Sequence, residues 1–439
     1  MAKQLNCRMR SLLLAVILVV LTSPAGASDQ PEAARLRATV DTLEHFGTRQ
    51  TSSTTTDPVR GIGAARTWVA DQLKSLSQQC GGCIEVGSIA RSFTGPRAPR
   101  GVDVVDLLGI QQGADPRRVV IVGAHIDSIN SDMLDFAGDA PGANDDGSGV
   151  ALVLEAARIL SKEKFPATIV YAIFSGEEQG LWGSTLLAET AKERGWTVTA
   201  MLNNDIVGST MGKNGIRVTD RVRVFSEGIR QSEDLSQQMA RRTNGGEDDG
   251  PSRALAKAIA KASRSVPRRL QVFLDRRPDR FGRGGDHEPF LDLGFPAVRF
   301  TVGAENWNWQ HQTVRTEAGV KFGDLIENMD FGYLAKVTAI NVATIRQLAG
   351  APAAPDLVTV EGALSQDTTV HWSAVIRAAR YRVYWRRNDQ QDWTNHADVS
   401  GTQFVARNTP IDDNFFGVSA LSADGRESLV TFGGPKPRN

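Results

Sequence analysis

The sequence predicts an α/β fold, a three-layer sandwich whose mixed, mainly parallel central sheet is flanked by helices, followed by a small all-β sandwich domain. In the first domain, residues 28–348, short apolar runs alternate with longer amphipathic ones. Strands that alternate with helices in this way are typical of layered folds with a parallel sheet. Beyond an alanine- and proline-rich linker at residues 349–355, the hydrophobic period changes to two. That period indicates antiparallel strands.

Each element of the first domain follows from its apolar spacing. Two early segments, residues 33–45 and 63–79, have apolar residues at helical spacing. Strands are then expected at residues 102–109, 118–124, 167–174, 200–205 and 297–301, and further helices at 148–162, 180–194, 252–263 and 331–348. Residues 208–283 are polar and rich in arginine. We expect them to form an excursion that packs over the functional site.

The C-terminal segment, residues 356–439, is expected to be a β-sandwich. Residues 369–372, 381–385 and 415–420 alternate between apolar and polar, and Ala-Asp-Gly at 423–425 is a hairpin turn signal. Trp372, Tyr381, Tyr384 and the strand at 414–418 resemble a fibronectin type III module. Nothing in this segment has catalytic character, so we expect an accessory that binds a surface, polymer or partner, or a spacer.

Residues 1–27 have the composition of a secretory signal peptide. Lys3, Arg8 and Arg10 precede an apolar run at residues 12–21, and Ala-Gly-Ala at 25–27 forms a cleavage site. The apolar run is too short to span a bilayer, and no later run is long enough. We therefore expect an exported protein, periplasmic or extracellular, that has no membrane contact after cleavage. An uncleaved N-terminal anchor is the alternative.

Charge and cysteine content narrow the range of partners and cofactors. Loss of residues 1–27 removes three positive charges and no negative one, so the net charge falls from zero to −3. This value is too near neutral to favour nucleic acid or an anionic membrane as a partner. Cys7 leaves with the signal peptide, and Cys80 and Cys83 remain. In an oxidising compartment this pair predicts a small structural disulfide rather than a redox site.

Five metal-capable side chains lie in sharply bounded motifs. His125 ends an apolar run in His-Ile-Asp, and Asp145 lies in Pro-Gly-Ala-Asn-Asp-Asp-Gly-Ser-Gly. Glu178 ends Phe-Ser-Gly-Glu-Glu, Asp205 follows Leu-Asn-Asn, and His311 lies in Trp-Gln-His-Gln. Each residue alone has an ordinary structural explanation. Together they match the two histidines and three carboxylates that two zinc ions sharing one carboxylate require.

Two acidic residues adjoin these candidates. Asp127, two residues beyond His125, is placed to orient the imidazole ring. Glu177 precedes Glu178 directly, so it would be carried close to the metal without binding it. A carboxylate in that position is suited to act as a general base.

The motifs resemble those of the secreted bacterial leucine-aminopeptidase type of two-zinc metallopeptidase, over roughly residues 100–345. The resemblance implies two Zn²⁺ per chain, with Asp145 as the bridging ligand. It also implies that Glu178 and His311 complete one zinc site, and that His125 and Asp205 complete the other. Spacing alone does not decide which ligand binds which metal.

The same resemblance implies the remaining roles. Glu177 becomes the catalytic base and Asp127 the acid that orients His125, and the peptide bond between Asp145 and Asp146 is expected to be cis. His287, in Gly-Gly-Asp-His, is the rival of His311 for the last ligand position, since either histidine satisfies zinc. The family pattern places a similar Asp-His pair near the pocket rather than on the metal.

The function that the resemblance implies is that of an exported aminopeptidase, with peptide or protein N-termini as substrates. A carboxypeptidase or dipeptidase on the same scaffold is the first alternative, because Arg276, Arg277, Arg280 and Arg283 are available for a substrate α-carboxylate. A single-zinc glutaminyl cyclase and a catalytically dead binding scaffold are further alternatives, against which the complete ligand set argues. The preferred side chain, the native metal and the oligomeric state do not follow from the sequence.

Overall fold

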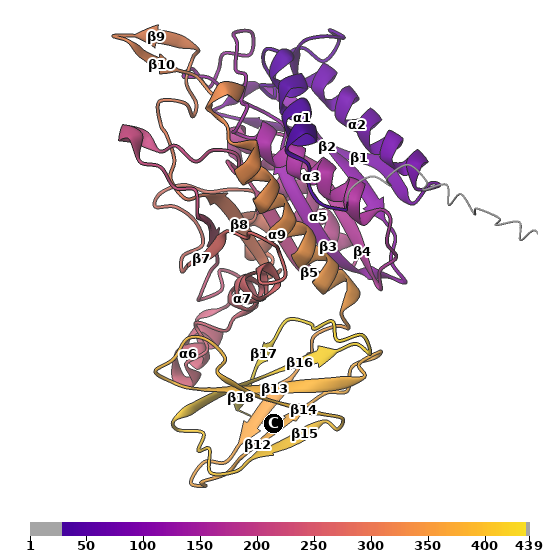
Figure 1. The fold of residues 1–439 in the computed structure, drawn as a ribbon, viewed down its shortest axis with the longest axis vertical. Helices are drawn as coiled ribbons and strands as arrows, with labels where there is room; N and C mark the ends of the chain where they lie inside the picture. The colour runs from indigo at the N-terminus through magenta and orange to yellow at the C-terminus, as the bar shows by residue number, and fades with distance from the viewer. Residues whose placement is uncertain (1–28, 436–439) are drawn as a thin grey trace, which may run out of the picture.

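The computed structural model describes residues 29–435, so the expected signal peptide lies outside the described residues. Its centre is an eight-stranded sheet in the order β1-β2-β4-β3-β5-β8-β6-β7 (Figure 1). The strands are β1 Ile84–Gly95, β2 Ala98–Gln111, β3 Asp115–His125, β4 Ala167–Phe174, β5 Thr197–Asn204, β6 Arg221–Phe225, β7 Gln271–Asp275 and β8 Ala297–Val302. Pairs β3–β4, β3–β5, β5–β8 and β6–β7 are parallel, and β1–β2, β2–β4 and β6–β8 are antiparallel. The expected mixed, mainly parallel sheet is confirmed.

Helices cover both faces of this sheet. On one face lie α1 Ala33–His45, α2 Gly61–Gln79, α3 Gly147–Leu160, α7 Pro251–Ser263 and α9 Phe331–Gly350, and on the other lie α5 Trp182–Glu193 and α8 Glu288–Asp292. Alternate residues of β3 enter opposite cores, Val120 on the first face and Ile121 on the second. Because both faces are covered, β3 reads as a continuous apolar run. None of the helices described between residues 29 and 435 has the length and hydropathy of a membrane span.

Residues 208–283 form more than the excursion over the site that the sequence predicted. They add β6 and β7 to the sheet, together with α7, α6 Leu235–Asn244 and the short helix η1 Lys213–Gly215. Strand β6 has an alternating Arg-Val-Arg-Val pattern, but it is only five residues long and lies in an arginine-rich, polar segment, so it was not predicted. Strand β1 was not predicted either, because most of its residues are exposed and pairing with β2 defines it.

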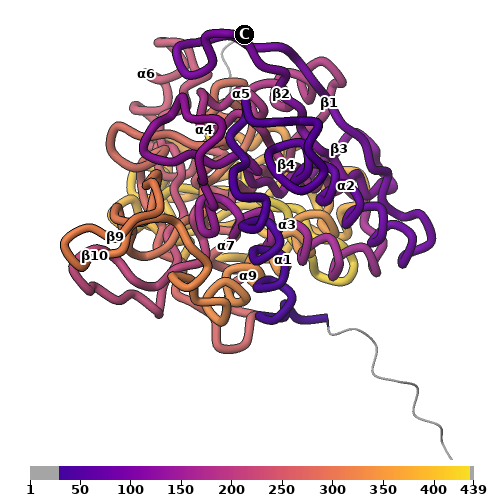
Figure 2. Tube along the Cα trace, turned by 90° about the horizontal axis from the view of Figure 1, so that it is seen from above, coloured from indigo at the N-terminus to yellow at the C-terminus, as the bar shows by residue number. Residues whose placement is uncertain are grey.

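The remaining short elements surround the strand ends. They are α4 Glu177–Gly180, η2 Ile326–Asn328 and the two-stranded hairpin β9 Arg315–Glu317 and β10 Val320–Phe322. Figure 2 shows this hairpin on the side of the molecule opposite α2. Cys80 and Cys83, just beyond α2, form a disulfide, as expected from their spacing.

The C-terminal residues form two four-stranded sheets around their own apolar core. The strands are β11 Val358–Glu361, β12 Thr368–Trp372, β13 Arg380–Arg387, β14 Asn395–Val399, β15 Gln403–Ala406, β16 Asn414–Leu421, β17 Thr431–Phe432 and β18 Gly434–Pro435. This sandwich lies against α6 and α7, below the large sheet in Figure 1. Buried Arg386 pairs there with Asp249, and Lys261 donates a hydrogen bond to the Tyr384 hydroxyl at 2.8 Å.

Candidate metal centre

Three neighbouring parallel strands deliver side chains to one edge of the large sheet. His125 is the last residue of β3, Glu178 follows the end of β4 within the short helix α4, and Asp205 follows β5 directly. Strands β4, β3 and β5 are adjacent in the sheet. The carboxyl ends of parallel strands meet at the same edge, and open α/β sheets form their sites there.

Asp145 comes from the loop between β3 and α3. The Asp145–Asp146 peptide bond is cis, as the resemblance implied. The buried Asp324 carboxylate holds this loop by accepting the backbone N–H groups of Asn144 at 2.9 Å and Asp145 at 2.7 Å. A fully buried arginine, Arg49, donates to the carbonyl oxygens of Pro141 and Gly142 in the same loop.

His311 comes from a loop far along the chain, just before β9. Its φ of 50° lies in the left-handed region, which a residue other than glycine adopts at a cost. Glu305 anchors the loop, because its carboxylate accepts from the Gln310 amide at 3.3 Å and pairs with Arg223, Arg280 and Arg283. These arginines lower the pKa of Glu305, although burial acts to raise it.

The five predicted ligands form two groups that share Asp145. The His125 Nε2 atom lies 3.2 Å from Asp145 Oδ1 and 3.9 Å from Asp205 Oδ2. The His311 Nε2 atom lies 3.1 Å from Asp145 Oδ2 and 3.1 Å from Glu178 Oε1. One oxygen of Asp145 therefore faces each histidine.

This donor set fits zinc. Ligand atoms about 2.0 Å from a tetrahedral zinc lie about 3.3 Å from one another, and the distances above bracket that value. The buried Asp205 Oδ1 atom has no hydrogen-bond partner within residues 29–435, and the buried His125 Nε2 and Glu178 Oε1 atoms contact only other ligand candidates. Buried polar atoms without partners are costly, and a cation among them removes that cost.

Electrostatics also favours cations at this position. The Glu178 carboxylate raises the pKa of His311 well above its usual range, although burial opposes the change. Burial raises the pKa of Glu177 well above its usual range, and the Glu178 and Asp205 carboxylates add to this effect. A divalent cation nearby would act in the opposite direction on the pKa of Glu177.

Asp127, which was expected to orient the His125 imidazole, contacts both His125 and the Glu177-Glu178 motif. The His125 Nδ1 atom lies 3.0 Å from the backbone oxygen of Asp127 and 3.7 Å from its Oδ1 atom. The Asp127 carboxylate accepts the backbone N–H groups of Glu177 at 3.3 Å and Glu178 at 3.1 Å. Asp127 therefore aligns the backbone of both glutamates, while its carbonyl is the closer partner of the imidazole.

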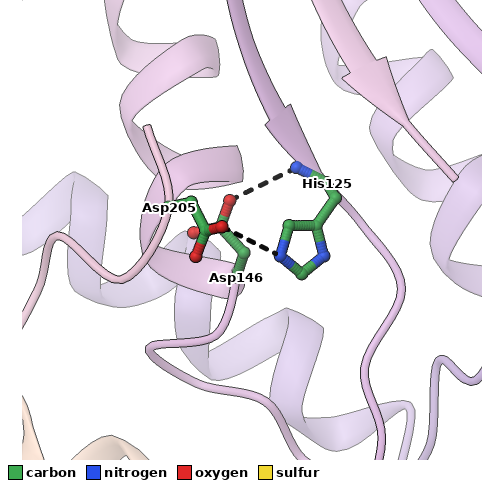
Figure 3. A group of neighbouring side chains, drawn as sticks. All are labelled: His125, Asp146 and Asp205. Carbon is green, nitrogen blue, oxygen red and sulfur yellow. Dashed lines mark hydrogen bonds and ion pairs between the residues drawn. The ribbon is translucent and has the colours of Figure 1, made fainter. Parts of the chain in front are cut away.

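Sequence reasoning assigned no site role to Asp146, which lies beside His125 and Asp205 (Figure 3). Its carboxylate accepts the backbone N–H of His125 at 3.2 Å and that of Gly149 at 2.9 Å, where it caps α3. Both oxygens therefore bind backbone groups, and Asp146 holds the end of β3 next to the metal centre. Its position directly before a helix was the one available signal.

Arg299, from β8, is a second residue that sequence reasoning missed. It is fully buried, with Nη2 at 2.8 Å from Asp205 Oδ2 and Nη1 at 3.3 Å from Asp279 Oδ2. The Nη1 atom also donates to the Gly284 carbonyl at 2.6 Å. Burial acts to raise the pKa of Asp279, but Arg299, His287 and Arg280 lower it to about 2.

His287 lies apart from the ligand groups. Its ring is buried, its Nε2 atom lies 2.7 Å from the Pro278 carbonyl oxygen, and its nearest carboxylate belongs to Asp279 at 3.8 Å. The structure thus brings His311, and not His287, to Asp145 and Glu178.

A cavity of about 390 Å³ opens over the metal centre. Asp145, Glu177, Glu178, Asp205 and His311 line one part of it, and Arg97, Arg280, Arg283 and Glu288 line another. A larger cavity, about 820 Å³, lies between the two domains, and none of the five ligand candidates borders it. The positions of the ligand candidates therefore identify the smaller cavity as the candidate substrate site.

Comparisons with known proteins find relatives of this chain in sequence and in fold. Peptidase family M28 matches residues 106–318, a range that contains all seven predicted site residues. A probable zinc metalloprotease of Pyrenophora tritici-repentis (strain Pt-1C-BFP) is 39% identical over 412 residues, covering 92% of this chain and 85% of the relative. The crystal structure of LapB from Legionella pneumophila has a TM-score of 0.53 at 18% identity and covers 72% of each chain. An aminopeptidase from Aneurinibacillus sp. strain AM-1 has a TM-score of 0.51 at 15% identity, covering 72% of this chain and 94% of the other. The two structural likenesses concern the fold alone.

Proposed function

The chain belongs to peptidase family M28 and is a zinc metalloprotease, and we propose that it acts as an exported aminopeptidase with two zinc ions. The family membership confirms the metallopeptidase part of the sequence prediction. One observation carries the two-zinc proposal: the two oxygens of Asp145 face His125 and His311, at 3.2 and 3.1 Å. A single carboxylate in that position is suited to bridge two ions.

The residues around Asp145 can perform the hydrolysis of a peptide bond. Zinc, when bound, polarises a carbonyl oxygen and lowers the pKa of a water molecule. Glu177, whose backbone Asp127 holds in place, accepts a proton from the attacking water and returns it to the leaving amine nitrogen. Asp205 and Glu178 each supply a carboxylate to one of the two ligand groups.

The size of the cavity and the structural neighbours support removal of terminal residues. A cavity of about 390 Å³ suits the end of a peptide better than the middle of a folded chain. A solved structure with the same fold is named an aminopeptidase. Export is supported by the composition of residues 1–27 and by the disulfide between Cys80 and Cys83, which is typical of oxidising compartments.

The test is hydrolysis of leucine p-nitroanilide beside its N-acetylated analogue. We expect cleavage of the free-amine substrate alone, loss of activity with a chelator, and a fall of about 10²- to 10⁴-fold in kcat for Glu177→Gln. Zinc analysis of both proteins should give two ions per chain. A protein that holds two zinc ions and cleaves neither substrate would refute the aminopeptidase proposal.

A carboxypeptidase or dipeptidase is the second candidate, and one observation favours it. Four arginines were proposed from the sequence to bind a substrate carboxylate. Of these, Arg280 and Arg283 line the cavity and can bind one there. Arg276 instead pairs with Asp248, and Arg277 lies against the Phe281 ring. Cleavage of a substrate with a blocked N-terminus and a free C-terminus would favour this candidate.

We propose an accessory role for the C-terminal domain, which sequence reasoning likened to fibronectin type III. Its described residues supply none of the ligand candidates. Its contacts with α6 and α7 suit a domain that braces the catalytic domain and presents a surface for a polymer or partner. Binding of the full chain to cell-surface polymers, compared with a chain that ends before residue 356, would test this role.

A further inference from the structure

The cavity over the metal centre is lined by arginines as well as by carboxylates, and we call Arg97, Arg280 and Arg283 its cationic wall. Arg97, Arg280 and Arg283 all border the cavity that Glu177 and His311 also line. They come from two separate segments, the turn between β1 and β2 and the segment between β7 and α8. Two distant parts of the chain therefore bring guanidinium groups to the same small space.

Arg97 is the least engaged of these arginines. It donates a hydrogen bond to the backbone carbonyl oxygen of Glu178, which places its guanidinium group beside a ligand candidate. It forms no ion pair with any carboxylate within residues 29–435. An arginine has five N–H donors in a planar fork that matches a carboxylate. Most of the donors of Arg97 thus stay available to a bound molecule.

Arg280 and Arg283 are held in place rather than neutralised. Both pair with Glu305, at 3.1 and 2.6 Å, and Arg223 pairs with the same carboxylate at 2.6 Å. One carboxylate therefore serves three guanidinium groups. Asp279, which also pairs with Arg280, is shared with a further arginine. This wall keeps an excess of positive charge.

Glu288, the other acidic group of the wall, does not remove the excess. Burial and the nearby Asp279 and Asp292 carboxylates raise its pKa to about 7. At neutral pH it carries only part of a negative charge. When two zinc ions are bound, as proposed, their charge would balance the carboxylates of Asp145, Glu177, Glu178 and Asp205, so these carboxylates would not cancel the excess either.

We propose that the wall formed by Arg97, Arg280 and Arg283 binds a substrate carboxylate, so that the preferred substrates are peptides with a carboxylate close to the scissile bond. This inference rests on the proposed function and names its substrate class. The carboxylate has two possible sources: an acidic side chain on the N-terminal residue, or the C-terminus of a dipeptide. In a cavity of about 390 Å³ both lie within one or two residues of the metal centre.

The experiment compares matched pairs that differ only in that carboxylate. For the zinc-loaded full chain, kcat/KM is measured for glutamate and glutamine p-nitroanilide, and for Leu-Gly and Leu-Gly amide. Calorimetry with the zinc-loaded Glu177→Gln chain measures binding of the same two pairs, without any need for turnover. We expect the charged member of at least one substrate pair to be favoured by about 10- to 100-fold, the range for a charge-assisted hydrogen bond.

Variants of Arg97 test whether the cationic wall causes this preference for the charged substrate. The ratio of kcat/KM within the favoured pair should fall about tenfold in Arg97→Gln and less in Arg97→Lys, which retains the charge. Arg100→Gln is the matched control, because Arg100 lies three residues further along and stacks on Phe136 instead of lining the cavity. Its ratio should equal that of the wild type. Zinc content is measured for every variant, so that metal loss is recognised.

The outcomes separate the inference from the proposed function. A preference for glutamate places the carboxylate on the first residue, a preference for Leu-Gly places it at the C-terminus, and either supports the proposal. Hydrolysis with equal kcat/KM in both pairs overturns the inference and leaves the aminopeptidase proposal standing. If no substrate is cleaved, the proposed function fails, and equal binding within both pairs then overturns the inference as well.

Discussion

Arg299 offers the sharpest test of how the metal centre is supported. Methionine has an unbranched apolar side chain that resembles the aliphatic part of arginine. Replacement therefore removes the guanidinium charge, which lies 2.8 Å from Asp205 Oδ2 and 3.3 Å from Asp279 Oδ2. Breaking a buried ion pair costs about 3–5 kcal/mol. Asp279 keeps Arg280 at 2.9 Å, and Asp205 keeps His125 at 3.9 Å. We therefore expect Arg299→Met to lower the free energy of unfolding by about 3 kcal/mol, the lower end of that range.

Urea unfolding followed by tryptophan fluorescence measures this change, in chelator and again with saturating zinc. The cost should be smaller with zinc, because a zinc ion at Asp205 replaces part of the lost positive charge. Arg387→Met is the matched control, since Arg387 pairs with Asp389 while 70% of its side chain is exposed. Exposed pairs contribute little to stability, because solvent screens them. If the two variants unfold alike, or if zinc leaves the cost of Arg299→Met unchanged, the proposed support of Asp205 is wrong.

Three further predictions concern stability. The pKa of Asp279 is lowered from 3.8 to about 2, so its stabilising effect is present above pH 4 and is lost as the pH falls through about 2. Between pH 4 and pH 2, the free energy of unfolding of the wild type should fall by about 2 kcal/mol more than that of Asp279→Asn, as measured by urea unfolding at a series of pH values. Replacing Cys80 and Cys83 by serine opens a very short loop and should lower the free energy of unfolding by about 2 kcal/mol. Arg386→Met leaves Asp249 buried at the domain interface and should lower the stability of the two-domain unit by up to about 3 kcal/mol in thermal unfolding.

Each of these has a result that would contradict it. Parallel pH profiles for wild type and Asp279→Asn would mean that the carboxylate is not stabilised by its arginines. An unchanged urea midpoint in the serine variant, with the wild type shown to be oxidised, would mean that the disulfide contributes nothing. Unaltered unfolding of Arg386→Met would show that the Arg386–Asp249 pair does not contribute to the coupling of the two domains.

Much of the fold could be predicted from the sequence because it depends on local periodicity. The helix at 33–45 and the strand at 167–174 were predicted with the bounds that the structure has. Strands β1, β6 and β7 could not be predicted in this way. Strand β1 is mostly exposed, β6 and β7 have five residues each, and pairing with a neighbouring strand defines all three. Most errors elsewhere are a few residues at element ends, where caps and turns rather than periodicity decide the boundary.

The metal-capable residues themselves were evident in the sequence, since each ends an apolar run or lies in a glycine-rich turn. The chain alone determined which residue types are available and that strand ends would bring several of them together. Only the tertiary structure decided that Asp145 faces both histidines and that His311, not His287, completes its group. It also decided that Arg97 and Arg299 lie at the site. Those contacts join segments far apart in the sequence, and their geometry depends on packing, burial and long-range ion pairs that no local pattern records.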